Sequence, residues 1–195
     1  MEKLIGRKKI KIAVFISGKG SNLLNLIKNF KKKNSKLSID LIFSDNKFAR
    51  GIQYGKKYDI PVKILDYKKT KFLAEKEALK ELNKKKIKII CLAGFMKILS
   101  HNFIKKFKGK IINIHPSLLP KYKGLNTHQR AIDNKDKYSG CTVHYVTSKL
   151  DSGKIIIQKK VKIYKNDNSK LLSKRVLKQE HIIYPIALKK LISSR

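Results

Sequence analysis

Residues 10–30 read IKIAVFISGKGSNLLNLIKNF, and this stretch decides the fold. The nearly continuous apolar run within Lys9–Ser17 predicts a buried strand of the kind used by parallel sheets. Gly18 and Gly20 then form a turn, and apolar residues at helical spacing in Asn22–Phe30 predict an amphipathic helix. A strand, a glycine turn and a helix in this order are typical of an α/β fold.

The same alternation continues along the chain. Strands are predicted at Ser38–Ser44, Val62–Leu65, Ile87–Ala93, Ile111–His115, Gly140–Val146 and Lys154–Lys162. Helices are predicted at Arg50–Tyr58, Phe72–Lys84, Thr127–Asn134 and Ser169–Ile192. The pattern predicts one α/β domain over residues 1–195, with a single doubly wound, mainly parallel sheet and helices on both faces.

Size and composition narrow the class of protein. A chain of 195 residues that is 42% hydrophobic is long enough for one well-buried core. Cys91 and Cys141 lie in apolar segments without Cys-x-x-Cys spacing, so we predict reduced core residues and no zinc site. No stretch approaches the roughly 20 apolar residues of a membrane helix, and residues 1–9 lack the apolar run of a secretory signal. We therefore expect a soluble cytoplasmic protein without membrane contact.

The net charge of +35 is extreme and invites a nucleic-acid-binding hypothesis. Lysine is spread over nearly every segment, however, and the runs at residues 31–33 and 84–86 fall at predicted helix ends, where cations suit the helix dipole. Aromatic residues do not interleave with these runs as a base-stacking platform requires. The charge therefore predicts attraction of anionic substrates rather than specific nucleic-acid recognition.

A second motif sets an amide and an imidazole two positions apart. Residues 111–120 read IINIHPSLLP, so Asn113 and His115 share one face of the predicted strand near its carboxyl end. Taken alone, such a pair is more typical of a strand end that satisfies local backbone groups. Asp151 adds a carboxylate in a turn after a later strand, and the three groups form a proton-handling set if the two turns meet.

The glycine turn after the first predicted strand suits an anion. Gly18 and Gly20 let the backbone approach closely, and Ser21 and Asn22 are suitable helix caps beside amides that attract phosphate. The Gly-Lys-Ser/Thr ending of a Walker A loop is absent, and Leu23 stands at the third glycine of a dinucleotide fingerprint. A single phosphomonoester therefore fits better than a dinucleotide.

A third segment, AGFMKILS at residues 93–100, closes the strand predicted at Ile87–Ala93. Such an apolar loop can wall a flat heterocycle and offer it backbone donors and acceptors, although simple core packing is its commoner role. Ligands of open α/β sheets bind beyond the carboxyl ends of the strands, where the turns at Gly18, Asn113 and Asp151 would fall.

Taken together, from about Ile10 to Pro185, these segments resemble the glycinamide ribonucleotide transformylases, or phosphoribosylglycinamide formyltransferases. The resemblance rests on ISGKGSN at 16–22, AGFMKILS at 93–100, NIHPSLLP at 113–120 and LDSG at 150–153. It implies a Rossmann-like formyltransferase fold and transfer of a formyl group from 10-formyltetrahydrofolate, a co-substrate, to the primary amine of glycinamide ribonucleotide in purine biosynthesis. It also implies small-molecule partners, no metal, no specific nucleic acid, and a monomer or weak homodimer.

The resemblance further implies roles for individual residues. The catalytic residues are Asn113, His115 and Asp151. The residues that bind glycinamide ribonucleotide are Gly20, Ser21 and Asn22, at its phosphate, and Glu180. The residues that bind 10-formyltetrahydrofolate are Lys71, Met96, Lys97, Ile98, Leu99, Asn113, Thr147, Ser148, Lys149, Leu150 and Asp151. Lys71 stands where related enzymes usually carry an arginine for the folate tail, and it lacks the bidentate fork of arginine.

The chemistry agrees with these side chains. A neutral amine attacks the formyl carbon, and the Asn113 amide and a protonated His115 can both donate hydrogen bonds to the developing oxyanion. Asp151 favours the imidazolium and can orient a water that carries the amine proton toward the departing folate nitrogen.

Three alternative hypotheses for the function remain open. A methionyl-tRNA formyltransferase shares the Asn-x-His core, but we expect it to need a second domain beyond Asp151. A formyltetrahydrofolate deformylase usually carries an additional domain before the first strand. A basic nucleic-acid binder without catalytic activity would keep its function when His115 is replaced. For His101, His144 and His181 we expect ordinary structural roles, and a role for His128 is not predicted.

Overall fold

A computed structural model describes residues 9–68 and 70–193. The strands are β1 (Ile10–Ile16), β2 (Leu37–Ser44), β3 (Val62–Ile64), β4 (Ile89–Leu92), β5 (Lys110–His115), β6 (Tyr138–Tyr145) and β7 (Ile155–Lys162). The helices are α1 (Ser21–Phe30), α2 (Gln53–Tyr58), α3 (Lys71–Lys84), α4 (His101–Lys106), α5 (Thr127–Asp133) and α6 (Ser169–Ser193), and a 3-10 turn at Arg50–Ile52 precedes α2.

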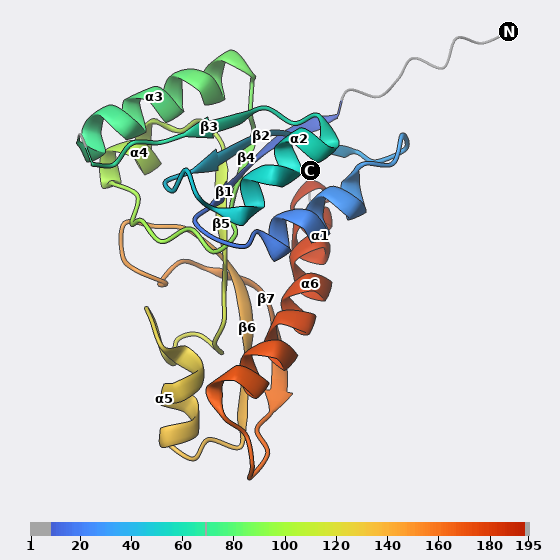
Figure 1. Ribbon diagram of the computed structural model, residues 1–195, viewed down its shortest axis with the longest axis vertical. Helices are drawn as coiled ribbons and strands as arrows, with labels where there is room; N and C mark the ends of the chain where they lie inside the picture. The colour runs from blue at the N-terminus through green and yellow to red at the C-terminus, as the bar shows by residue number, and fades with distance from the viewer. Residues whose placement is uncertain (1–8, 69, 194–195) are drawn as a thin grey trace, which may run out of the picture.

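Within the described ranges all strands belong to one sheet, in the order β3-β2-β1-β4-β5-β6-β7 (Figure 1). Strands β1 to β5 are parallel, whereas β6 pairs antiparallel with both β5 and β7. The carboxyl ends of β1, β4 and β5 therefore meet at one edge of the sheet, which is where open α/β sheets bind ligands.

Alternating side chains along β1 explain why both faces of the sheet carry helices. Ile12, Val14 and Ile16 pack into a core with α1 and α6, whereas Ala13 and Phe15 pack into a second core with α3 and α4. All five are fully buried. The predicted doubly wound sheet with helices on both faces is confirmed.

Most predicted elements lie within a residue or two of their observed bounds, and the differences have local causes. The predicted helix Arg50–Tyr58 divides into the 3-10 turn and α2, and β6 begins at Tyr138, two residues before the predicted start at Gly140. Residues 1–8 of the predicted single domain lie outside the described residues. Cys91 and Cys141 are buried free thiols, as predicted.

Helix α4 was not predicted, because its six residues carry little apolar periodicity. Ser100 caps it by accepting a hydrogen bond from the Phe103 N–H at 3.0 Å. Ser100 is in turn bound through its N–H and its hydroxyl by the buried carboxylate of Glu75 in α3. A contact between distant segments therefore stabilises this short helix.

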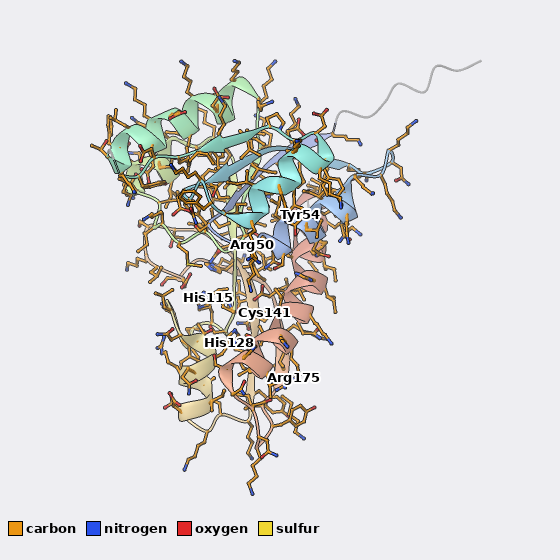
Figure 2. The ribbon with its side chains drawn as sticks, viewed as in Figure 1. Arg50, Tyr54, His115, His128, Cys141 and Arg175 are labelled. Atoms are coloured by element: carbon orange, nitrogen blue, oxygen red, sulfur yellow. The ribbon has the colours of Figure 1, made fainter. Side chains whose placement is uncertain are left out.

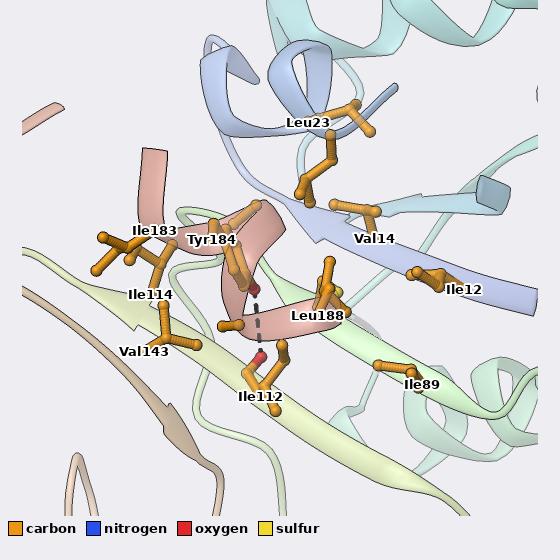
Figure 3. Packing of buried hydrophobic residues seen from close by; sticks show 14 of the residues in the cluster. Ile12, Val14, Leu23, Ile89, Ile112, Ile114, Val143, Ile183, Tyr184 and Leu188 are labelled. Carbon is orange, nitrogen blue, oxygen red and sulfur yellow. Dashed lines mark hydrogen bonds between the residues drawn. The ribbon is translucent and has the colours of Figure 1, made fainter. Parts of the chain in front are cut away.

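Helix α6 is attached to the sheet through one buried hydroxyl. Tyr184 is fully buried, and its hydroxyl donates its one proton mainly to the Leu92 carbonyl at 2.8 Å. The Ile112 carbonyl lies farther from Oη, at 3.4 Å, and Figure 3 shows this longer contact. Glu180 lies one helical turn earlier on the same side of α6. The anchor therefore fixes this part of α6, which also carries Glu180, relative to β4 and β5. No helix of the described ranges has the length and apolar character to cross a membrane.

We expect Tyr184→Phe to lower the free energy of unfolding by about 1 to 2 kcal/mol, because the buried hydrogen bond from its hydroxyl to the Leu92 carbonyl is lost. Tyr138→Phe serves as the matched control, since Tyr138 is half exposed at the start of β6. Urea unfolding followed by circular dichroism measures both changes. An equal loss in the two variants would contradict the proposed anchor.

Candidate active site

A cavity of about 830 Å³ opens where β1, β4, β5 and β6 end. Five groups of residues line it: the glycine turn with the start of α1, the loop after β4, the end of β5, the segment around the start of α5, and the turn after β6. Glu180 of α6 closes one side. In Figure 2, His115 and His128, which both line the cavity, lie near each other in the middle of the molecule.

The three residues predicted to handle protons come together in this cavity. His115 Nδ1 lies 3.4 Å from Asp151 Oδ2, and both side chains are less than one-tenth exposed. Asn113 Nδ2 lies 3.5 Å from Asp151 Oδ1. The turn that follows β5 and the turn that follows β6 therefore meet, as the predicted proton-handling set requires.

His144 is a fourth member of this cluster, which the sequence analysis missed. Its Nε2 lies 3.3 Å from Asn113 Nδ2 and 3.6 Å from Asp151 Oδ1. Its Nδ1 lies 2.8 Å from the Tyr145 carbonyl, which can only accept. The sequence analysis expected only an ordinary structural role for His144, because its partners depend on the β5–β6 register, which sets His144 opposite Asn113.

Asp151 is held as a carboxylate by its surroundings. Burial acts to raise its pKa, but the contact with His144, the 2.9 Å hydrogen bond from the Gly124 N–H and the neighbouring His115 together outweigh burial and lower it. The cluster thus keeps a negative charge at its centre.

His115 is under opposing influences. Burial lowers the pKa of its ring, and it outweighs the Tyr122 carbonyl and Asp151, which act to raise the pKa. The Nε2 atom donates to the Tyr122 carbonyl at 2.9 Å, while Nδ1 faces Asp151. Both ring nitrogens therefore point at protein acceptors. This differs from the expected imidazolium that donates directly to substrate, since one of these contacts has to open first.

The glycine turn presents backbone rather than side-chain groups. Gly20 is the N-cap of α1 with φ 70°, and no side chain caps the helix, so the expected capping by Ser21 and Asn22 was wrong. Asn22 instead donates from Nδ2 to Glu180 Oε2 at 2.7 Å, and burial raises the pKa of Glu180. A Cβ on Gly20 would lie 2.7 Å from Gly51 Cα, so this turn requires glycine.

The loop after β4 is tied to the glycine turn. Ser17 Oγ accepts from the Met96 N–H at 2.8 Å, and the Ser17 N–H donates to the Gly94 carbonyl at 3.1 Å. Met96 and Ile98 line the cavity although 64% and 60% of their surfaces are exposed. Exposed apolar side chains at a cavity mouth are typical of a site for a flat apolar ligand.

Other predicted residues are distributed around this cavity. The predicted binding residues that line it are Gly20, Ser21, Asn22, Met96, Lys97, Ile98, Leu99, Thr147, Lys149, Leu150 and Glu180. Lys71, exposed at the start of α3, and Ser148 are outside the set of described residues that line it. His128 lines the cavity, and burial lowers its pKa, with a smaller contribution from His115. Over residues 9–68 and 70–193 no group of three His, Cys, Asp or Glu is arranged to hold a metal ion.

The fold and this cluster define a class of protein. The family model described as "Formyl transferase" matches residues 10–188, and the chain belongs to this family. It is 38% identical over 179 residues to the phosphoribosylglycinamide formyltransferase of Escherichia coli, covering 91% of this chain and 84% of that protein. The crystal structure of phosphoribosylglycinamide formyltransferase from Brucella melitensis is 42% identical with a TM-score of 0.89, covering 94% of this chain and 96% of that one.

A second group of relatives is much longer. The chain is 41% identical over 184 residues to the human trifunctional purine biosynthetic protein adenosine-3, covering 93% of this chain but 18% of that protein. It therefore spans less than one-fifth of the length of that relative.

Burial of the His115 ring predicts that the free energy of unfolding depends on pH. Because its pKa is lowered in the folded protein, the unfolded chain binds a proton first as the pH falls below about 6.5, and stability falls. We expect His115→Asn to lose less unfolding free energy than the wild type between about pH 7.5 and about pH 5.5.

Urea unfolding at the two pH values measures this difference. His101→Asn is the control, because His101 is exposed at the start of α4. Equal pH dependence in His115→Asn and His101→Asn would contradict the prediction.

Proposed function

We propose that this chain transfers the formyl group of 10-formyltetrahydrofolate to the primary amine of glycinamide ribonucleotide, a step of purine biosynthesis. One observation carries the proposal: Asn113, His115 and Asp151 meet inside a cavity that has a phosphate-type turn and an apolar loop in its wall. A phosphorylated amine and a flat cofactor-like donor can then face each other across this cluster.

The nucleotide end is built from backbone amides and one carboxylate. Gly20, Ser21 and Asn22 hold the phosphate, because the uncapped N-terminus of α1 leaves its first amides for an anion. Glu180, which accepts a hydrogen bond from Asn22 and lines the cavity, contacts the glycinamide ribonucleotide. Lys19 lines the same part of the cavity and adds positive charge.

The folate end is apolar. Met96, Ile98, Leu99 and Leu150 supply the walls for the pterin, and their backbone supplies donors and acceptors. Lys97, Lys149, Thr147 and Ser148 belong to the same two loops. Lys71 lies outside the cavity wall, where it meets the glutamate tail as a point charge.

At the centre, the amine nitrogen forms a bond to the formyl carbon, and the bond from that carbon to the folate nitrogen breaks. Asn113 has two hydrogens on Nδ2, so one can hold Asp151 or His144 while the other donates to the oxyanion. The pair formed by His115 and Asp151, through a water, moves the proton from the amine to the departing folate nitrogen.

The similarity to phosphoribosylglycinamide formyltransferases over most of both chains supports this substrate pair. A methionyl-tRNA formyltransferase activity has no comparable support. The deciding assay incubates the purified protein with glycinamide ribonucleotide and 10-formyltetrahydrofolate, with formylatable methionyl-tRNA in a parallel reaction. Mass spectrometry should detect formylglycinamide ribonucleotide; formylation of the tRNA alone would overturn the proposal.

Substitutions at the centre should separate chemistry from folding. We expect Asn113→Ala to lower kcat about 100- to 1000-fold, because one oxyanion donor is lost. His115→Ala and Asp151→Ala should abolish formyl transfer, while circular dichroism shows folded protein. His101→Ala is the control and should keep wild-type turnover. Substantial turnover by His115→Ala or Asp151→Ala would contradict the assigned roles.

A further inference from the structure

The turn at residues 121–126, here named the clasp turn, is held in an unusual conformation next to the catalytic cluster. Tyr122, Gly124 and Asn126 have φ values of 55°, 78° and 57°. Glycine and asparagine tolerate this left-handed region, but a bulky aromatic residue adopts it only where its surroundings require it. The contacts of Tyr122 therefore keep the clasp turn in this conformation.

Asp136, in the turn before β6, supplies those contacts. Its Oδ2 accepts from Tyr122 Oη at 2.8 Å, and its carboxylate oxygens lie 3.1 and 3.2 Å from Lys121 Nζ. The Arg130 guanidinium stacks 5.1 Å from the centre of the Tyr122 ring and donates to the Lys123 carbonyl at 2.8 Å. Asp136 and Arg130 thus both contact the clasp turn and stabilise its conformation.

The clasp turn gives one backbone group to each member of the catalytic pair. The Tyr122 carbonyl accepts from His115 Nε2 at 2.9 Å, and the Gly124 N–H donates to Asp151 Oδ2 at 2.9 Å. These two groups are only two residues apart in the sequence. The conformation of the turn therefore sets the acceptor of His115 and the donor of Asp151 together.

We propose that Asp136 is a positioning residue: by holding Tyr122 and Lys121 it keeps the clasp turn in the conformation that orients His115 and Asp151. Neither Asp136 nor Tyr122 is among the described residues that line the cavity, so both act through the backbone rather than on substrate. The catalytic consequence of this role rests on the proposed formyl transfer, whereas its effect on the His115 ring does not.

Two variants test the role while preserving side-chain shape. Tyr122→Phe removes the hydroxyl but keeps the ring under Arg130, and Asp136→Asn removes the charge. Asp40→Asn is the matched control: Asp40 also pairs with a lysine, at 3.3 Å from Lys11 Nζ, and is 23% exposed against 17% for Asp136. Thermal unfolding shows whether each variant is folded.

The first readout is the pKa of the His115 ring, measured by NMR titration and assigned with His115→Asn. Asp151, His144, Arg130 and His128 also face this ring and remain unchanged in the two variants. We expect the His115 pKa to fall in Tyr122→Phe and Asp136→Asn, because a loosened Tyr122 carbonyl favours the protonated ring less. Asp40→Asn should leave this pKa unchanged.

The second readout is steady-state kinetics. In both variants kcat should fall about tenfold or more while the KM values stay within about twofold, because the catalytic pair is misplaced but the binding walls are intact. Tyr122→Phe combined with Asp136→Asn should be no worse than the more damaging single change, since both act on the same contact between Tyr122 and Asp136.

Folded variants that keep both the wild-type His115 pKa and the wild-type kcat would overturn the positioning role, even if their melting temperatures fall. If the wild type transfers no formyl group, the proposed function fails, and the NMR titration alone still decides whether Asp136 positions His115. A lowered pKa and a lowered kcat, both absent from Asp40→Asn, support the proposal.

Discussion

The carboxylate of Asp151 is the interaction on which the site depends. Its Oδ1 contacts Asn113 and His144, and its Oδ2 contacts His115 and the Gly124 N–H. These partners come from β5, β6 and the segment before α5, so one charge joins three parts of the fold. A buried carboxylate without such donors would be strongly destabilising. Asp151 also has φ 44°, in the left-handed region that aspartate tolerates better than most residues.

Acidic residues are scarce in this chain, yet two of them face the cavity. The chain has 13 acidic against 48 basic side chains, and Asp151 and Glu180 both face the cavity. The surrounding field attracts anionic ligands, which suits the phosphate and the folate carboxylates of the proposed substrates. Inside, the two carboxylates provide local negative charge where the proposed reaction handles an amine and a proton. The overall charge thus favours the approach of anionic ligands, and the two carboxylates in the cavity help to orient the ligands once they are bound.

Local patterns in the sequence were sufficient for the fold, and the resemblance to a known family added most of the cavity wall. The apolar run of β1 and the helical spacing of α1 depend on neighbours in the chain, and both were predicted within a residue or two. His144 and α4 were missed because each depends on a distant partner: the β5–β6 register for His144, and Glu75 for the start of α4. Asp136 gave no signal, since its partner Tyr122 lies 14 residues away across a helix.

The geometry also divides the chemical work between Asn113 and His115. Both ring nitrogens of His115 face protein acceptors, and burial lowers its pKa, so its ring is poorly placed to donate to a new oxyanion. The amide of Asn113 has two hydrogens on Nδ2, and when one holds His144 or Asp151 the other is left to donate. In the proposed reaction, Asn113 therefore stabilises the oxyanion. His115 takes up a proton only while the amine proton is being transferred. The Tyr122 carbonyl and the Asp151 carboxylate then both favour the imidazolium.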